Sequence, residues 1–206
     1  MPLNGAPLAR AYFDGLKHAY HERGAGQVWE KFASAAHGPG EEDLTALKVL
    51  YPALPAGLEA LLRFADGTYY REYRPGEKTC LSFLGSDLEE FPYYLLSAEQ
   101  MVKTRNEFQE WGDYLIKREF DDPVDERITN DFDHLLWLHF ADCRNNGGSS
   151  QLFIDFSPSE RGRPGQIVRY LHDPDELAVI AGSFDEYLEM LMENEYDFIN
   201  EDTVDE

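Results

Sequence analysis

Basic side chains are scarce in this sequence. Eighteen Lys and Arg stand against 40 Asp and Glu, which gives a formal net charge of −22 over 206 residues. Because such a chain is repelled by phosphate backbones and by anionic lipid, we expect neither a nucleic-acid partner nor a membrane partner. A basic protein would be attracted, with fast and salt-sensitive association. The same charge also keeps a protein soluble, so both interpretations stay open.

Cysteine is nearly absent, and there is no long hydrophobic run. Cys80 and Cys143 lie far apart and form no CxxC pair. This spacing argues against a disulfide framework or a cysteine-based zinc site, and we predict two reduced thiols. Residues 1–6 lack the basic and apolar regions of a secretory signal, and no apolar stretch is long enough to span a bilayer. We therefore expect a cytoplasmic protein.

Catalytic and cofactor signatures are missing as well. No GxxxxGK[ST] phosphate loop occurs, and Gly24-Ala25-Gly26 lacks the third glycine and the preceding strand of a dinucleotide-binding loop. His18 and His21 are three residues apart on a predicted helix, a spacing that can place two ligands on one face, but no HExxH pattern accompanies them. We predict no catalytic residue, no metal and no cofactor, and hence a binding protein.

An enzyme is the alternative hypothesis. Strands of one sheet can bring histidines and carboxylates together in a cleft, where they could act with or without a metal in a hydrolase-like reaction. The first candidates for such a site are His134, His139, Asp142 and Asp155.

Hydrophobic residues are abundant enough for one domain with a sizeable core. They make up 43% of the chain, and 14% of the residues are aromatic. Helical spacing predicts helices within 6–36, at 41–50, from Pro55 to Phe64, at 97–117 and from Ser183 onward. Residues 135–141 are apolar at nearly every position, which predicts a strand covered on both faces, and alternation predicts a strand at 151–156. Further short strands are predicted near 68–73, 79–83, 166–171 and 177–181. This order is typical of an α+β fold with a largely antiparallel sheet.

The C-terminal segment is the most acidic part of the chain. Residues 170–206 contain 13 carboxylates and no Lys or Arg, which is more than half of the net charge. One interpretation is a solvated helix face followed by a frayed tail. The other is an acidic docking surface with aromatic anchors for a basic partner. The candidate binding residues are Asp173, Asp175, Glu176, Tyr187, Glu193, Glu195, Tyr196 and Asp197.

Several short motifs follow one another in a recognisable order. Leu54-Pro55 begins a predicted helix that ends at Phe64-Ala65-Asp66-Gly67. The later motifs are Gly147-Gly148, the strand with Asp155, Gly165-Gln166-Ile167-Val168, Ala181-Gly182-Ser183-Phe184 and Tyr187-Leu188. Over residues 40 to 192 the sequence resembles the SUKH superfamily, the Smi/Knr-like domain, with its "LP…(N/D)G" opening and "…GG…D…GxV…SFxxfL" ending. Asp66 stands where Asn is common, and the segment at about 85–130 is a long insertion.

The resemblance implies a twisted mixed sheet flanked by helices, and a protein that acts by binding. Bacterial members of the superfamily include immunity proteins that neutralise toxin domains, often nucleases, and fungal members are linked to regulation of cell-wall assembly. We therefore predict a helical N-terminal extension at 1–40 packed on the core, a SUKH-like domain at 41–192 and an acidic tail at 193–206. The partner would be a basic protein, and the oligomeric state stays open.

Overall fold

The computed structural model describes residues 3–88, 92–119, 123–145, 148–172 and 174–200. Its helices are α1 (Gly5–Glu22), α2 (Gly26–Ala33), α3 (Glu41–Leu50), α4 (Ala56–Phe64), α5 (Ala98–Lys103), α6 (Glu107–Trp111), α7 (Asp113–Ile116) and α8 (Phe184–Glu193). Its strands are β1 (Tyr69–Arg74), β2 (Glu77–Cys80), β3 (Tyr94–Leu95), β4 (Trp137–Asn145), β5 (Gly148–Asp155), β6 (Gln166–Leu171) and β7 (Glu176–Ala181). A short 3-10 helix spans Phe132–His134. The α+β prediction is confirmed.

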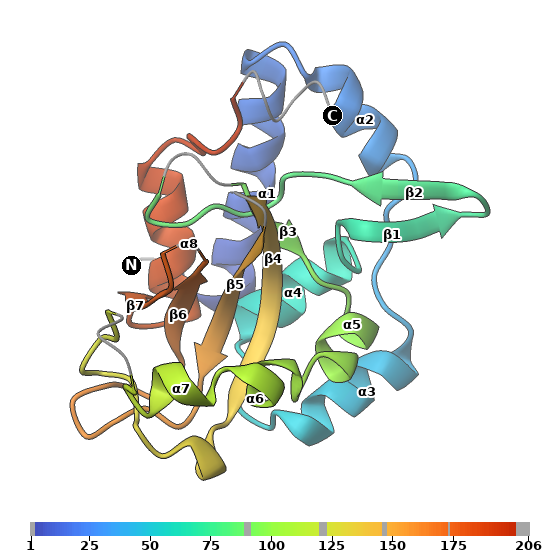
Figure 1. Ribbon diagram of the computed structural model, residues 1–206. Coiled ribbons are helices and arrows are strands. Elements are labelled where there is room, and N and C mark those ends of the chain that lie inside the picture. The colour runs from blue at the N-terminus through green and yellow to red at the C-terminus, as the bar shows by residue number, and fades with distance from the viewer. Residues whose placement is uncertain (1–2, 89–91, 120–122, 146–147, 173, 201–206) are drawn as a thin grey trace.

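The main sheet has the strand order β3-β4-β5-β6-β7, and each neighbouring pair is antiparallel. An isolated parallel bridge joins Val124 to Leu177 of the outer strand β7, but it lies outside the named strands, and the five strands themselves form an antiparallel sheet. β1 and β2 form a separate hairpin, which extends away from the main sheet (Figure 1). A register shift in β4 between His139 and Ala141 marks a bulge. Because a bulge changes which side chains share a face, it affects the polar residues that follow it.

Both faces of the main sheet are covered. Leu138 and Phe140 of β4 belong to the core cluster that includes residues of α1, α4 and α8. Trp137 of β4 and Phe153 of β5 belong to a second cluster, with Phe108 of α6 and residues of α7. Figure 1 shows α6 and α7 in front of the sheet, with α1 and α8 behind it. This two-sided burial explains why the sequence before residue 141 is apolar at nearly every position.

The N-terminal helix α1 belongs to the main core. Its Tyr12, Leu16 and Tyr20 are buried, and the two tyrosine hydroxyls donate to the carbonyls of Phe83 and Ser82, each at 2.7 Å. Among the described residues, no helix is long and apolar enough to cross a membrane.

Two predictions about local structure were wrong. The single helix predicted at 97–117 is divided into α5, α6 and α7, with breaks at residues 104–106 and at Gly112. The frayed tail is wrong for residues 194–200, because Tyr196, Phe198 and Ile199 are buried in the main core. Glu195 and Tyr196 adopt positive φ angles of 53° and 55°, and they turn the chain sharply after α8. Residues 201–206 lie outside the described part of the chain.

Candidate functional site

Two of the predicted binding residues are buried aromatic side chains. Tyr187 is fully buried and its hydroxyl donates to the Gly85 carbonyl at 2.6 Å. Tyr196 is also buried, and its hydroxyl donates to the Tyr12 carbonyl at 3.1 Å. Both tyrosines hold α8 and the C-terminal segment against the core, so the prediction that they anchor a partner at the surface was wrong.

Two of the predicted carboxylates take part in internal contacts at the start of β7. The Asp175 carboxylate accepts hydrogen bonds from the hydroxyls of Tyr114 and Tyr170, and it lies 3.1 Å from His172 Nδ1. Burial acts to raise the pKa of Asp175, but these hydrogen bonds together lower it below its usual range. Glu176 lies 3.6 Å from the buried Arg169 guanidinium. These contacts are structural, and Asp173 lies outside the described residues.

The remaining candidates lie at the end of α8, where the structure does expose carboxylates. Glu193 and Glu195 are exposed, and Asp197 is half-buried. Glu186 is also exposed and Glu189 half-exposed. The spacing of Glu186, Glu189 and Glu193 places them on one side of the helix. We call Glu186, Glu189, Glu193 and Glu195 the α8 acidic face.

The residues of the alternative enzyme hypothesis do not form one cluster. His134 is exposed, and its ring contacts Asp131 at 2.9 Å. Asp155 is fully buried, and its oxygens accept from the Ser157 backbone N–H at 2.8 Å and the Gln166 amide at 2.9 Å. Burial raises the pKa of Asp155 to about 6, although its hydrogen bonds act to lower it. The structure brings only His139 and Asp142 together.

His139 and Asp142 form a partly buried pair on β4. His139 Nε2 lies 3.1 Å from Asp142 Oδ1 and 3.2 Å from the Ala141 carbonyl oxygen. Because both neighbours are acceptors, Nε2 carries the proton and donates. Nδ1 of the same ring is buried and has no hydrogen-bond partner among the described residues.

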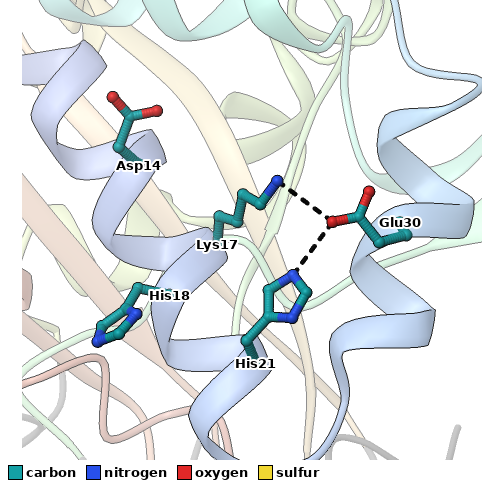
Figure 2. A pocket seen from close by; sticks show the side chains of 5 residues that line it. All are labelled: Asp14, Lys17, His18, His21 and Glu30. Atoms are coloured by element: carbon teal, nitrogen blue, oxygen red, sulfur yellow. Dashed lines mark hydrogen bonds and ion pairs between the residues drawn. The ribbon is translucent and has the colours of Figure 1, made fainter.

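The two N-terminal histidines lie beside a cavity of about 420 Å³ between α1 and α2. Lys17 and His21 both contact the Glu30 carboxylate, at 3.2 and 3.1 Å, whereas His18 points to the other side of α1 (Figure 2). His18 pairs instead with Glu22 at 3.2 Å. The two histidines therefore do not converge. In the part of the chain that the structure describes, no group of three His, Cys, Asp or Glu side chains is placed to hold a metal.

A further pocket, of about 290 Å³, lies beside β4 and α5. We call it the β4–α5 pocket, and its lining residues are Tyr69, Leu96, Gln100, Thr104, Glu107, Asp142 and Gln151. The side-chain oxygens of Gln151 and Thr104 are buried and have no hydrogen-bond partner among the described residues. Sequence reasoning identified Asp142 but missed Gln151 and Thr104. The alternation of β5 places Gln151 on the same face as Phe153, but no sequence signal indicated the position of Thr104.

Asp66 and Gly67, from the first motif of the predicted domain, hold three elements together. Asp66 is buried, and its carboxylate accepts from the Arg71 guanidinium at 2.6 Å and from the Ala98 backbone N–H at 2.9 Å. Burial raises the pKa of Asp66. Gly67 has a φ of +87°, and a Cβ atom there would lie 2.6 Å from the Ser97 nitrogen. These residues connect α4, β1 and α5.

A comparison with protein-family models identifies the family. The model of the SMI1 / KNR4 family (SUKH-1) matches residues 38–190, well over half of the chain. The chain belongs to the SMI1/KNR4 family. A search of curated proteins finds no match. The SUKH-1 match extends from just before α3 into α8, so it includes Asp66, Gly67 and Asp155. Their contacts lie inside the fold of this chain.

Proposed function

We propose that this SUKH-1 protein is a non-catalytic binding protein whose partner is a basic protein. The partner would be a toxin domain of the nuclease type, which makes this chain an immunity protein, or else a regulatory target. The single observation that carries the proposal is the α8 acidic face: exposed and half-exposed carboxylates on α8 and just beyond its end, in a chain with a net charge of −22. The hydrolase alternative has less support, since of its four candidate residues only His139 and Asp142 lie close together.

The electrostatics of α8 favour a cationic partner. No Lys or Arg follows Arg169 in the sequence, and the last turn of α8 has no basic residue. Arg23 is an exception, because its guanidinium donates to the neutral Glu195 carbonyl oxygen at 2.8 Å and so places a positive charge beside Glu195. Among the described residues, Glu186, Glu189 and Glu193 form no ion pair. A surface with such an excess of negative charge raises the association rate of a basic protein and repels anionic competitors. A nuclease groove that binds phosphates presents such a basic surface, and the carboxylates would take the place of phosphate charge.

Affinity purification from the native cell in a salt series tests this proposal. We expect the chain to recover a basic protein at low salt and to lose it as salt rises, because salt screens exposed charges. Recovery of no protein at low salt would contradict the proposal.

Charge-reversal variants test the position of the surface. Replacement of Glu186, Glu189 and Glu193 by lysine should abolish recovery of the partner. The matched control replaces Glu42, Glu77 and Glu160, which are exposed on other elements, and it changes the net charge equally. The control should retain most of the binding. Equal losses in both variants would show that total charge, and not the α8 acidic face, determines binding.

A further inference from the structure

The β4–α5 pocket contains a buried polar atom that the fold does not satisfy. Gln151 is only 4% exposed, and its Oε1 atom has no hydrogen-bond partner among the described residues. The Thr104 hydroxyl, at the end of α5, is buried in the same way. A buried acceptor without a donor lowers the stability of the folded state. A folded protein that keeps two such groups in one pocket has a place for a ligand that donates hydrogen bonds.

The charge of the lining selects a cationic ligand. Asp142 and Glu107 both line the pocket, and of the described residues no Lys or Arg does. The nearby Lys103 pairs with Glu99 at 2.6 Å. The fixed His139 contact leaves Asp142 one further carboxylate oxygen. The aromatic ring of Tyr69 adds a surface that attracts cations.

The volume of the pocket and the arrangement of its hydrogen-bond acceptors favour one kind of cationic ligand. At about 290 Å³ the pocket is at the lower limit of ligand sites, which span roughly 300–1,000 Å³, and it suits one side chain better than a cofactor. Its acceptors come from different elements, namely β4, β5 and the α5–α6 region. A guanidinium group has five N–H donors in a planar fork and can reach several acceptors at once, whereas an ammonium group is a compact point charge.

We propose that the β4–α5 pocket binds the guanidinium group of an arginine side chain from the basic partner, a proposal that rests on the function proposed above. The arginine would donate to the Gln151 and Asp142 side chains, with its charge over Tyr69. This pocket would then supply the specific contact, while the α8 acidic face speeds association.

A direct titration tests the chemistry without the partner. The full chain is titrated with a capped Gly-Arg-Gly peptide, with the same peptide carrying citrulline or lysine, and with methylguanidinium, and NMR follows the Gln151 side-chain amide. We expect the arginine peptide to shift this resonance in a saturable way, and the neutral citrulline peptide to leave it unchanged. No saturable shift with arginine, or equal shifts with citrulline, would overturn the proposal.

Variants then connect the pocket to the partner. Gln151→Leu and Asp142→Asn should each weaken partner binding by about tenfold or more, because each removes a hydrogen bond to a charged group. The matched controls are Gln27→Leu and Asp133→Asn, at exposed positions outside the pocket, which should bind normally. Thermal unfolding of each free variant checks that it folds, and Gln151→Leu should unfold at a higher temperature than the wild type.

The two proposals can fail separately. If the wild type recovers a basic partner and the pocket variants bind it equally well, the arginine contact is wrong while the binding function stands. If no partner is recovered but the arginine peptide saturates the pocket, the binding function is wrong and the guanidinium site itself is supported. If methylguanidinium binds as tightly as the peptide and the pocket variants leave partner binding unchanged, the ligand is a small molecule, and an arginine from the partner is excluded.

Discussion

Asp155 offers a sharp test of the electrostatics inside the fold. Its carboxylate is fully buried where β5 ends, and burial raises its pKa from 3.8 to about 6. The folded protein therefore holds this proton more tightly than the unfolded chain does. The stabilisation is complete below the unfolded-state pKa and is lost as the pH rises through the folded-state value. Wild-type stability should fall from this cause as the pH rises from about 4 to about 6.

The size of the effect follows from the two pKa values. A difference of about two between the folded and unfolded states corresponds to about 3 kcal/mol, of which about 1.3 kcal/mol lies between about pH 5 and pH 7. Asp155→Asn removes this titration, although its amide would place an N–H group against the Gln166 amide that now donates to Asp155. That lost hydrogen bond costs about 1 kcal/mol at every pH. The free energy of unfolding of the variant should therefore rise relative to that of the wild type as the pH rises.

Urea denaturation at a series of pH values, from about pH 5 to about pH 7.5, measures the difference between the two proteins. Titrations of the other carboxylates largely cancel in that difference, because both chains share them. Glu160→Gln, at an exposed position, is the control for the loss of one carboxylate elsewhere in the chain. A flat difference for Asp155→Asn, or one that favours the wild type more at higher pH, would refute the account of a buried and protonated Asp155.

Three further predictions concern packing. Gly67→Ala should lower the free energy of unfolding by about 2–4 kcal/mol, measured by thermal unfolding. The control Gly76→Ala, at a position that also has a positive φ but no atom within 4 Å of the new Cβ, should lower it by about 1 kcal/mol. Equal losses of stability would refute the close approach at Gly67. Truncation after Asn194 should lower the free energy of unfolding by on the order of 5 kcal/mol and so unfold the protein, because it removes buried core residues. Tyr196→Phe, which loses only the hydroxyl hydrogen bond, should lower it by about 1 kcal/mol. A truncated chain that stays stable in urea denaturation would refute a stabilising role of the C-terminal segment. Gln151→Leu should stabilise the free protein by about 1–3 kcal/mol, and a lower unfolding temperature would show that its amide is satisfied.

Much of the C-terminal fold could be predicted because its signals are local. The alternation in β5 and the apolar run in β4 determine which faces are buried, and both faces are covered as predicted. The helix starts at Ser97 and Ser183 are also as predicted: Ser97 and Gln100 form a capping box, and the Ser183 side chain accepts from the Glu186 backbone N–H. A capping signal marks where a helix begins but not where it ends.

The division of the predicted helix at 97–117 has a tertiary cause. Its periodic apolar residues are compatible with one long amphipathic helix, yet Phe108 packs against Trp137 and Phe153 on the sheet, with ring centroids 4.9 and 5.3 Å apart. A Cβ atom at Gly112 would lie 2.4 Å from the Phe108 ring, so the chain passes close to that ring there. Such packing depends on contacts between distant segments, which propensity and spacing do not encode.

The candidate site was harder to predict because charge and burial gave opposite signals. Tyr187 and Tyr196 stand among carboxylates, and this suggested surface anchors. For Tyr187 the helical period, shared with Phe184, Leu188 and Leu191, gave the correct position in the core. No periodic signal exists for Tyr196, whose burial depends on a turn with positive φ angles. The β4–α5 pocket is assembled from elements far apart in the sequence, so spacing could not indicate it.

The folded C-terminal segment strengthens the argument for binding through α8. A frayed acidic tail would lose conformational entropy on binding, whereas carboxylates held on a helix are already ordered and lose less. That order carries an energetic cost, because Glu193 ends α8 beside the negative end of the helix dipole and without a basic residue in the last turn. Repulsion between the neighbouring carboxylates adds to this cost. A cationic partner would relieve both the unfavourable dipole interaction and the repulsion between carboxylates. Part of its affinity would therefore come from electrostatic repulsion that is present in the free protein.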